Sequence, residues 1–165
     1  MGKIHHLKSI QNLPVSLEKA WKFFSDPHNL LTLTPPFLNL KMTNELFGDE
    51  VYAGQVMMYT VKPMLGIPVA WMTEITHVER HKFFVDEQRN GPYQLWHHQH
   101  HFKSIEGGVE MTDLVHYRLP FSFLGDVAHT ITVKNKLKEI FTYRYFKINE
   151  LFGDWPESKI LLTVD

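Results

Sequence analysis

The strongest constraint on the fold is the stretch from 38 to 119, in which apolar and polar residues alternate with a period of two. This alternation is typical of β-strands that bury one face. Short turn-forming segments interrupt it, and Glu106-Gly107-Gly108 is the clearest of them. Because a parallel crossover needs about a dozen residues, such short links require antiparallel pairing. The predicted strands are 38–46, 54–62, 68–77, 82–89, 94–105 and 109–119.

Different patterns flank this stretch. Residues 3–12 are predicted as one more strand, and Ser16 is expected to cap a short helix after it. A second short helix is expected to begin at Pro27 and to end at Thr34-Pro35-Pro36, since prolines lack a backbone donor. Apolar residues at helical spacing predict a long helix from Asp126 to about Glu150. The predicted fold class is therefore α+β, with a curved antiparallel sheet of about seven strands wrapped around the long C-terminal helix.

Composition narrows the classes of function. The chain has 165 residues, enough for one domain, which is predicted over 1–152, and the tail 153–165 receives no assignment. No apolar stretch reaches the roughly 20 residues of a membrane helix and no signal peptide follows Met1, so a cytoplasmic protein without integral membrane association is expected. The absence of cysteine excludes disulfides and thiolate-bound metals, and a net charge of −1 argues against nucleic-acid binding. Phosphate-loop, dinucleotide and nucleophile-elbow motifs are absent, and no cofactor is predicted.

One predicted strand is rich in histidine, in the run from Trp96 to Phe102. Alternation places Trp96, His98, His100 and Phe102 on one face of this strand. A face that carries tryptophan and phenylalanine is expected to face the helix. A sheet that wraps around a helix tends to leave a cavity between them, and the two histidines are therefore predicted to lie inside this cavity or at its rim.

His98 and His100 are two residues apart, so their Cβ atoms are expected to lie roughly 6–7 Å from each other. This spacing suits one metal ion only with a third ligand, for which Asp113, Asp86 and His116 are the candidates. Nothing in the spacing selects one of them, and inward histidines more often hydrogen-bond to carboxylates across a sheet. No metal site is therefore predicted.

Neighbouring strands are expected to add polar residues to the same face. Asp86 and Gln88 share one face of their strand, and Asp113 and Tyr117 share one face of another. Together with the histidines they predict a polar band inside an apolar pocket. One interpretation is a structural band that satisfies its own hydrogen bonds. The other is a functional band that orients a ligand carbonyl or hydroxyl, or performs acid–base chemistry.

The hairpin turn at Gly107-Gly108 sets the expected register of this band. Counting back from the turn brings Asp113 to the neighbourhood of Phe102. The same count brings Tyr117 towards His98.

A single arginine, Arg144, interrupts the apolar stripe of the long helix between Phe141 and Ile148. On the cavity side it would pair with an acid such as Asp86 or Asp113, or meet an anionic group of a ligand. The alternative is that it extends to solvent at the flank of the helix.

Several short motifs follow one another along the chain. They are Thr34-Pro35-Pro36; Gly66-Ile67-Pro68 with Trp71; Phe84, Asp86 and Gln88 before Gly91-Pro92-Tyr93; Trp96, His98, His100 and Phe102; Asp113, Tyr117, Pro120 and Gly125; and Phe141 with Arg144. Their order, over roughly residues 3–152, resembles the bacterial ligand-binding branch of the START-like (SRPBCC) superfamily, which includes the birch-pollen-allergen proteins, START lipid-transfer domains and aromatase/cyclases. The resemblance implies the helix-grip fold, with a ligand cavity between the sheet and the long helix.

The fold order and the polar band together favour a binder of a small hydrophobic molecule of lipid, polyketide or aromatic type. The residues expected to contact that molecule are Trp71, Asp86, Gln88, Trp96, His98, His100, Phe102, Asp113, Tyr117, Phe141 and Arg144.

An alternative is an enzyme of the polyketide cyclase/dehydratase kind, in which His98 or His100 would be the base and Asp113 its orienting partner. A further alternative is a protein-interaction module that uses the apolar links 63–68 and 121–124. A homodimer through an edge strand is left open.

Overall fold

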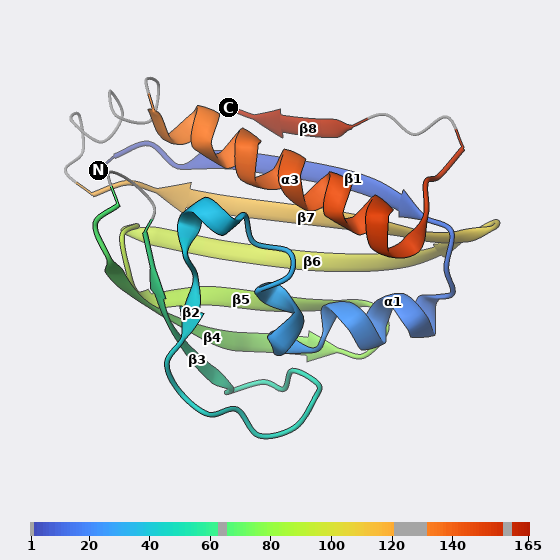
Figure 1. The fold of residues 1–165 in the computed structure, drawn as a ribbon, viewed down its shortest axis with the longest axis horizontal. Helices are drawn as coiled ribbons and strands as arrows, with labels where there is room; N and C mark the ends of the chain where they lie inside the picture. Colours follow the sequence, from blue (N-terminus) through green and yellow to red (C-terminus); the bar gives the residue numbers. More distant parts are fainter. Residues whose placement is uncertain (1, 63–65, 121–131, 157–159) are drawn as a thin grey trace.

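The computed structural model describes residues 2–62, 66–120, 132–156 and 160–165. Within them, eight strands form one antiparallel sheet in the order β2-β3-β4-β5-β6-β7-β1-β8 (Figure 1). The strands are β1 His5–Leu13, β2 Lys41–Met42, β3 Val56–Val61, β4 Val69–Glu79, β5 Phe83–Asn90, β6 Leu95–Ile105, β7 Gly108–Arg118 and β8 Leu161–Val164. The α+β prediction and its antiparallel meander are confirmed.

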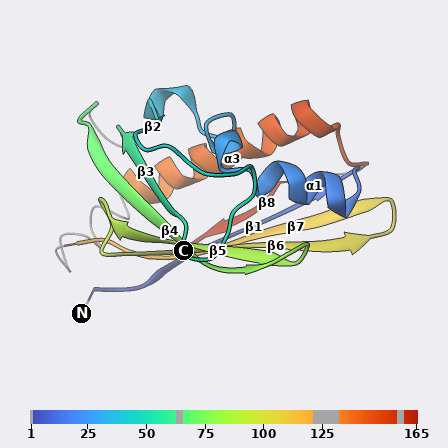
Figure 2. The same ribbon diagram turned by 90° about the horizontal axis from the view of Figure 1, so that it is seen from below.

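The helices lie together on one face of the curved sheet (Figure 2). They are α1 Leu17–Phe24, the 3-10 helices η1 Pro27–Leu30 and η2 Pro36–Leu38, and α3 Lys134–Phe152. The Ser16 hydroxyl accepts a hydrogen bond from the Lys19 amide at 3.2 Å, which confirms the predicted cap of α1. The long helix ends at Gly153, whose φ of 95° lies in the region that favours glycine.

Two of the helix predictions are not confirmed. The second short helix was expected to continue through Leu33, but only one 3-10 turn forms, and a further 3-10 turn follows Pro35. Proline starts a turn well but removes the donors that a longer helix would need. The predicted start of the long helix at Asp126 lies outside the described residues.

The predicted strand 38–46 is wrong, since only Lys41–Met42 pairs as a strand. The side chain of Asn44 takes over the pairing with β3. Its amide nitrogen donates to the Val56 carbonyl at 3.1 Å, and its oxygen accepts from the Met58 amide at 2.8 Å. An asparagine side chain that binds backbone groups in this way offers an alternative to the main-chain ladder, so the strand ends there.

The register of the hairpin between β6 and β7 also differs from the expected one. Ile105 pairs with Gly108, which leaves a two-residue turn. Asp113 therefore lies opposite His100 rather than Phe102, and Tyr117 lies opposite Trp96 rather than His98. A shift of two residues keeps every side chain on its predicted face, so the inward set is unchanged.

The tail, which the sequence left unassigned, supplies strand β8 at the edge of the sheet beside β1 (Figure 1). Leu7 pairs with Val164 and Ile10 with Leu161. Val164 is buried, while its neighbour Thr163 is exposed. The tail is thus part of the sheet.

We expect Val164→Ala to lower the free energy of unfolding by about 1–2 kcal/mol, because buried methyl groups are lost against Leu7 and its neighbours. Thr163→Ala is the matched control and should stay within about 0.5 kcal/mol. Urea denaturation monitored by tryptophan fluorescence measures both. Equal, negligible effects would contradict the docking of β8 on β1.

Two apolar clusters hold the helices against the sheet. The first surrounds Trp21, whose ring meets Phe84 and Phe102 edge-on at centroid distances of 6.1 and 5.6 Å. The second joins Leu137 and Phe141 of α3 to the strands β6, β7, β1 and β8.

Among the described residues, no helix has the length and apolar character needed to cross a membrane.

Candidate functional site

A cavity of about 580 Å³ lies between the sheet and α3. Its wall is mainly apolar and draws on both core clusters. Seven of the residues predicted to contact a ligand line it: Trp71, Asp86, Trp96, His98, His100, Phe141 and Arg144. The strand face that carries Trp96 and His98 thus faces the helix, as the alternation predicted.

The other four predicted contact residues lie outside the cavity wall. Asp113 lies behind the two histidines, with only 1% of its surface exposed. Gln88 binds the backbone at Tyr93, donating to its carbonyl at 2.6 Å and accepting from its amide at 3.2 Å. Asp113 thus contacts the wall residue His98, and Gln88 contacts the wall residue Tyr93, although neither lines the cavity itself.

The two aromatic members of this group are packing residues in the described structure. Phe102 contacts Trp21 and Phe24 in the first core cluster, both at a centroid distance of 5.6 Å. Tyr117 is fully buried beside Trp96 in the second cluster.

Five residues form what we call the inner polar cluster: Asp86, His98, His100, Asp113 and Arg144. Each histidine lies between the two carboxylates. His98 Nε2 lies 2.9 Å from Asp113 Oδ1, and its Nδ1 lies 3.4 Å from Asp86 Oδ2. His100 Nε2 lies 2.7 Å from Asp86 Oδ2, and its Nδ1 lies 3.0 Å from Asp113 Oδ1.

Local structure explains this arrangement. In β6 the buried residues alternate with half-buried ones from Trp96 to Phe102, which aims both imidazoles at the cavity. Strand pairing then sets Asp86 opposite His98 and Asp113 opposite His100. Arg144 reaches the cluster from α3, with its guanidinium 3.6 Å from Asp113 Oδ1.

Burial and charge act in opposite directions on these groups. Burial alone would raise the pKa of Asp113, but Arg144 and the histidines hold that pKa well below its usual value. The pKa of Asp86 is lowered too, because its contacts with His98 and His100 outweigh burial. Both carboxylates are therefore ionised at neutral pH.

The two histidines are shifted in opposite directions. Burial lowers the pKa of His98, and the neighbouring His100 lowers it further. Burial also acts to lower the pKa of His100, but the contacts with Asp113 and Asp86 outweigh it, so that pKa is raised. Because the two imidazoles contact each other and the same two carboxylates, they titrate as a coupled pair.

The guanidinium of Arg144 has a donor without a partner among the described residues. The Nε of Arg144 is buried and makes no hydrogen bond to any described residue. Arg144 also lines the cavity. An unpaired buried donor is costly, so this group favours a ligand oxygen or water within its reach.

Sequence reasoning missed several wall residues. Thr73 and Ile75 lie on the same face of β4 as Trp71 and could have been found by the period of two. Tyr93 also lines the cavity, and burial raises its pKa. Tyr93 lies between strands, where no periodicity marks the direction of a side chain.

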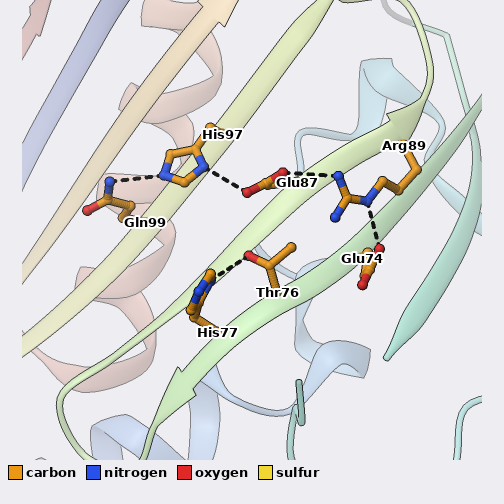
Figure 3. A network of polar contacts seen from close by, with 7 residues as sticks. All are labelled: Glu74, Thr76, His77, Glu87, Arg89, His97 and Gln99. Carbon is orange, nitrogen blue, oxygen red and sulfur yellow. Dashed lines mark hydrogen bonds and ion pairs between the residues drawn. The ribbon is translucent and has the colours of Figure 1, made fainter. Parts of the chain in front are cut away.

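The opposite face of the sheet carries a separate polar network (Figure 3). Arg89 joins Glu74 at 2.6 Å and Glu87 at 3.1 Å, and Glu87 contacts His97 Nδ1 at 3.1 Å. His97 Nε2 in turn lies 3.0 Å from the Gln99 amide. These side chains are half-buried or exposed, and none of them lines the cavity.

No family model and no curated protein matches the sequence. Solved structures do match it. Protein CV1439 from Chromobacterium violaceum has a TM-score of 0.68 at 11% identity, over 92% of this chain and 99% of that chain. The ginseng major latex-like protein 151 from Panax ginseng has a TM-score of 0.65 at 11% identity, again over 92% and 99%. Ara h 8.0201 has a TM-score of 0.59 at 17% identity, over 90% and 99%.

These likenesses define the class of fold. The neighbours include proteins of the birch-pollen-allergen type, and the chain has their helix-grip fold: a wide antiparallel sheet with a long C-terminal helix across one face.

Proposed function

We propose that this protein binds one small hydrophobic molecule of lipid, polyketide or aromatic type in the cavity, with a carbonyl or hydroxyl oxygen directed at the inner polar cluster. The observation that carries the proposal is a mainly apolar cavity with the inner polar cluster in its wall. Its volume of about 580 Å³ falls within the roughly 300–1,000 Å³ of small-molecule sites. Membership of the bacterial ligand-binding branch of the START-like superfamily is part of this proposal.

The chemistry of the wall supports an apolar ligand with one polar end. Water against the apolar wall lacks hydrogen-bond partners, so its replacement by an apolar molecule is favourable. The polar cluster offers the buried Nε of Arg144 and the imidazoles of His98 and His100 at one place. These polar groups would fix the orientation of the ligand, while contact with the apolar wall would supply most of the binding affinity.

A cofactor-free cyclase or dehydratase is the second candidate. It is favoured by the placement of His98 and His100 on the cavity wall, each held by carboxylates at hydrogen-bonding distance. Such a pair suits proton transfer next to a carbonyl group, with Asp113 as the orienting partner. Turnover of the bound molecule separates this candidate from a binder.

Native mass spectrometry of gently purified protein tests the proposal. We expect a defined hydrophobic compound at nearly one molecule per chain, which organic extraction releases for identification. Incubating that compound with fresh protein then shows whether it is converted. A chain that carries nothing and also fails to bind a panel of fluorescent apolar probes would contradict the proposed function.

A further inference from the structure

We propose that Asp86, His98 and His100 form a binding site for one divalent transition-metal ion of the zinc or iron(II) type, open to the cavity. The sequence left the third ligand undetermined, and the structure supplies it. One potential ligand atom from each of the three residues lies within 4.8 Å of the others, and among the described residues no other such group is found.

The distances suit a metal ion. Bonds of roughly 2.0–2.2 Å to imidazole nitrogen and carboxylate oxygen place tetrahedral ligand atoms about 3.3–3.6 Å apart. Asp86 Oδ2 lies 3.4 Å from His98 Nδ1 and 2.7 Å from His100 Nε2. The shorter contact has to open by roughly 0.6–0.9 Å on the same geometry, and the ligand nitrogens of the two histidines lie within 4.8 Å of each other.

Proton accounting favours the same three atoms. Without a metal, both nitrogens of each histidine face a carboxylate oxygen, yet a neutral imidazole has only one N–H. His100 Nδ1 is also buried and out of line for a hydrogen bond to Asp113. A metal at His98 Nδ1 and His100 Nε2 leaves one N–H on each ring. That of His98 is already aligned with Asp113 Oδ1, whereas that of His100 lies 3.0 Å from the same oxygen and has to turn to align with it.

Asp113 would then be the partner of both metal-bound histidines. Its Oδ1 lies 2.9 Å from His98 Nε2 and 3.0 Å from His100 Nδ1. A carboxylate that binds the second nitrogen of a ligating histidine fixes the ring and its tautomer, as is usual at metal sites. Arg144 beside Asp113 balances its charge.

The site faces the cavity, which leaves room for a further ligand. Asp86, His98 and His100 all line the cavity. Three protein ligands with an open position are typical of metal sites that bind a substrate or water. The inference does not depend on the proposed hydrophobic ligand, because the metal alone tests it.

Protein without an affinity tag is freed of metal with a chelator and titrated with Zn²⁺ by calorimetry and with Co²⁺ by visible absorption. We expect one equivalent to bind, with cobalt bands typical of nitrogen and oxygen ligands. Asp86→Asn and His98→Gln should each weaken binding at least tenfold, and Asp113→Asn should weaken it by roughly 10- to 100-fold.

The matched control is the double variant His97→Gln/His101→Gln, which removes histidines of the same strand from its outer face. It should bind Zn²⁺ as the unchanged protein does. Imidazole nitrogen NMR spectra of the unchanged protein avoid any effect of mutation on folding, and the shifts on adding Zn²⁺ should be confined to His98 and His100. Absence of binding, shifts at His97 or His101, or equal loss in the control would overturn the proposal.

Discussion

Replacement of Asp113 by asparagine is expected to lower the free energy of unfolding by about 3 kcal/mol in metal-free protein. The Asp113 carboxylate is buried and contacts His98, His100 and Arg144. Asparagine has nearly the same shape but no charge, so Arg144 loses the carboxylate it contacts, and Asp86 is the carboxylate left beside the histidines. Breaking a buried ion pair from one side costs about 3–5 kcal/mol, and the access of Arg144 to the cavity places this site at the low end.

Glu87→Gln provides the control for this substitution. Glu87 also accepts contacts from an arginine and a histidine, Arg89 and His97, but on the partly exposed outer face (Figure 3). Solvent screens those pairs, so we expect a loss of less than about 1 kcal/mol. Urea denaturation of the two variants at neutral pH measures the difference. A loss for Asp113→Asn no larger than for Glu87→Gln would show that the inner polar cluster contributes little to stability.

The central strands were predictable from sequence because their two faces meet different surroundings. β6 was expected over 94–105 and is found at Leu95–Ile105, and β7 was expected over 109–119 and is found at Gly108–Arg118. Both strands lie inside the sheet, where one face packs on the core, and such burial produces the period of two directly.

The edges of the sheet were less predictable because they depend on distant partners. Strand β2 is cut short by the Asn44 side chain, which binds β3 backbone twelve or more residues further along the chain. Strand β8 has only four residues and exists through its pairing with β1 at the other end of the sequence. A local pattern does not carry that information.

The site could be predicted only in part, because the direction of a side chain is a local property of its strand whereas its partners depend on pairing between strands. Alternation identified His98, His100 and Asp86 as inward residues, which is a local property of each strand. Which carboxylate meets which imidazole depends on the register across three strands, and the expected hairpin register was displaced by two residues. The role of Asp113 as a partner of both rings follows only from the observed pairing.

Thr73→Trp is expected to weaken the binding of an apolar probe, such as anilinonaphthalene sulfonate, by roughly a hundredfold, equivalent to about 2.7 kcal/mol. Thr73 is buried on β4, and its side chain faces the cavity beside Trp71 and Ile75. A tryptophan at this position would occupy space that the ligand needs. Since the added ring enters a cavity and not a packed core, the cost in stability should stay below the roughly 1–3 kcal/mol of overpacking.

Thr76→Trp is the matched control, because Thr76 belongs to the same strand but lies on its outer face, where it contacts His77 (Figure 3). The same change of side chain there should leave probe affinity unchanged. Fluorescence titration gives the affinity of each variant, and thermal unfolding shows that each remains folded. Equal affinity for both variants would place the probe outside the cavity and contradict the proposed binding site, whereas selective loss in Thr73→Trp ties binding to the space between the sheet and α3.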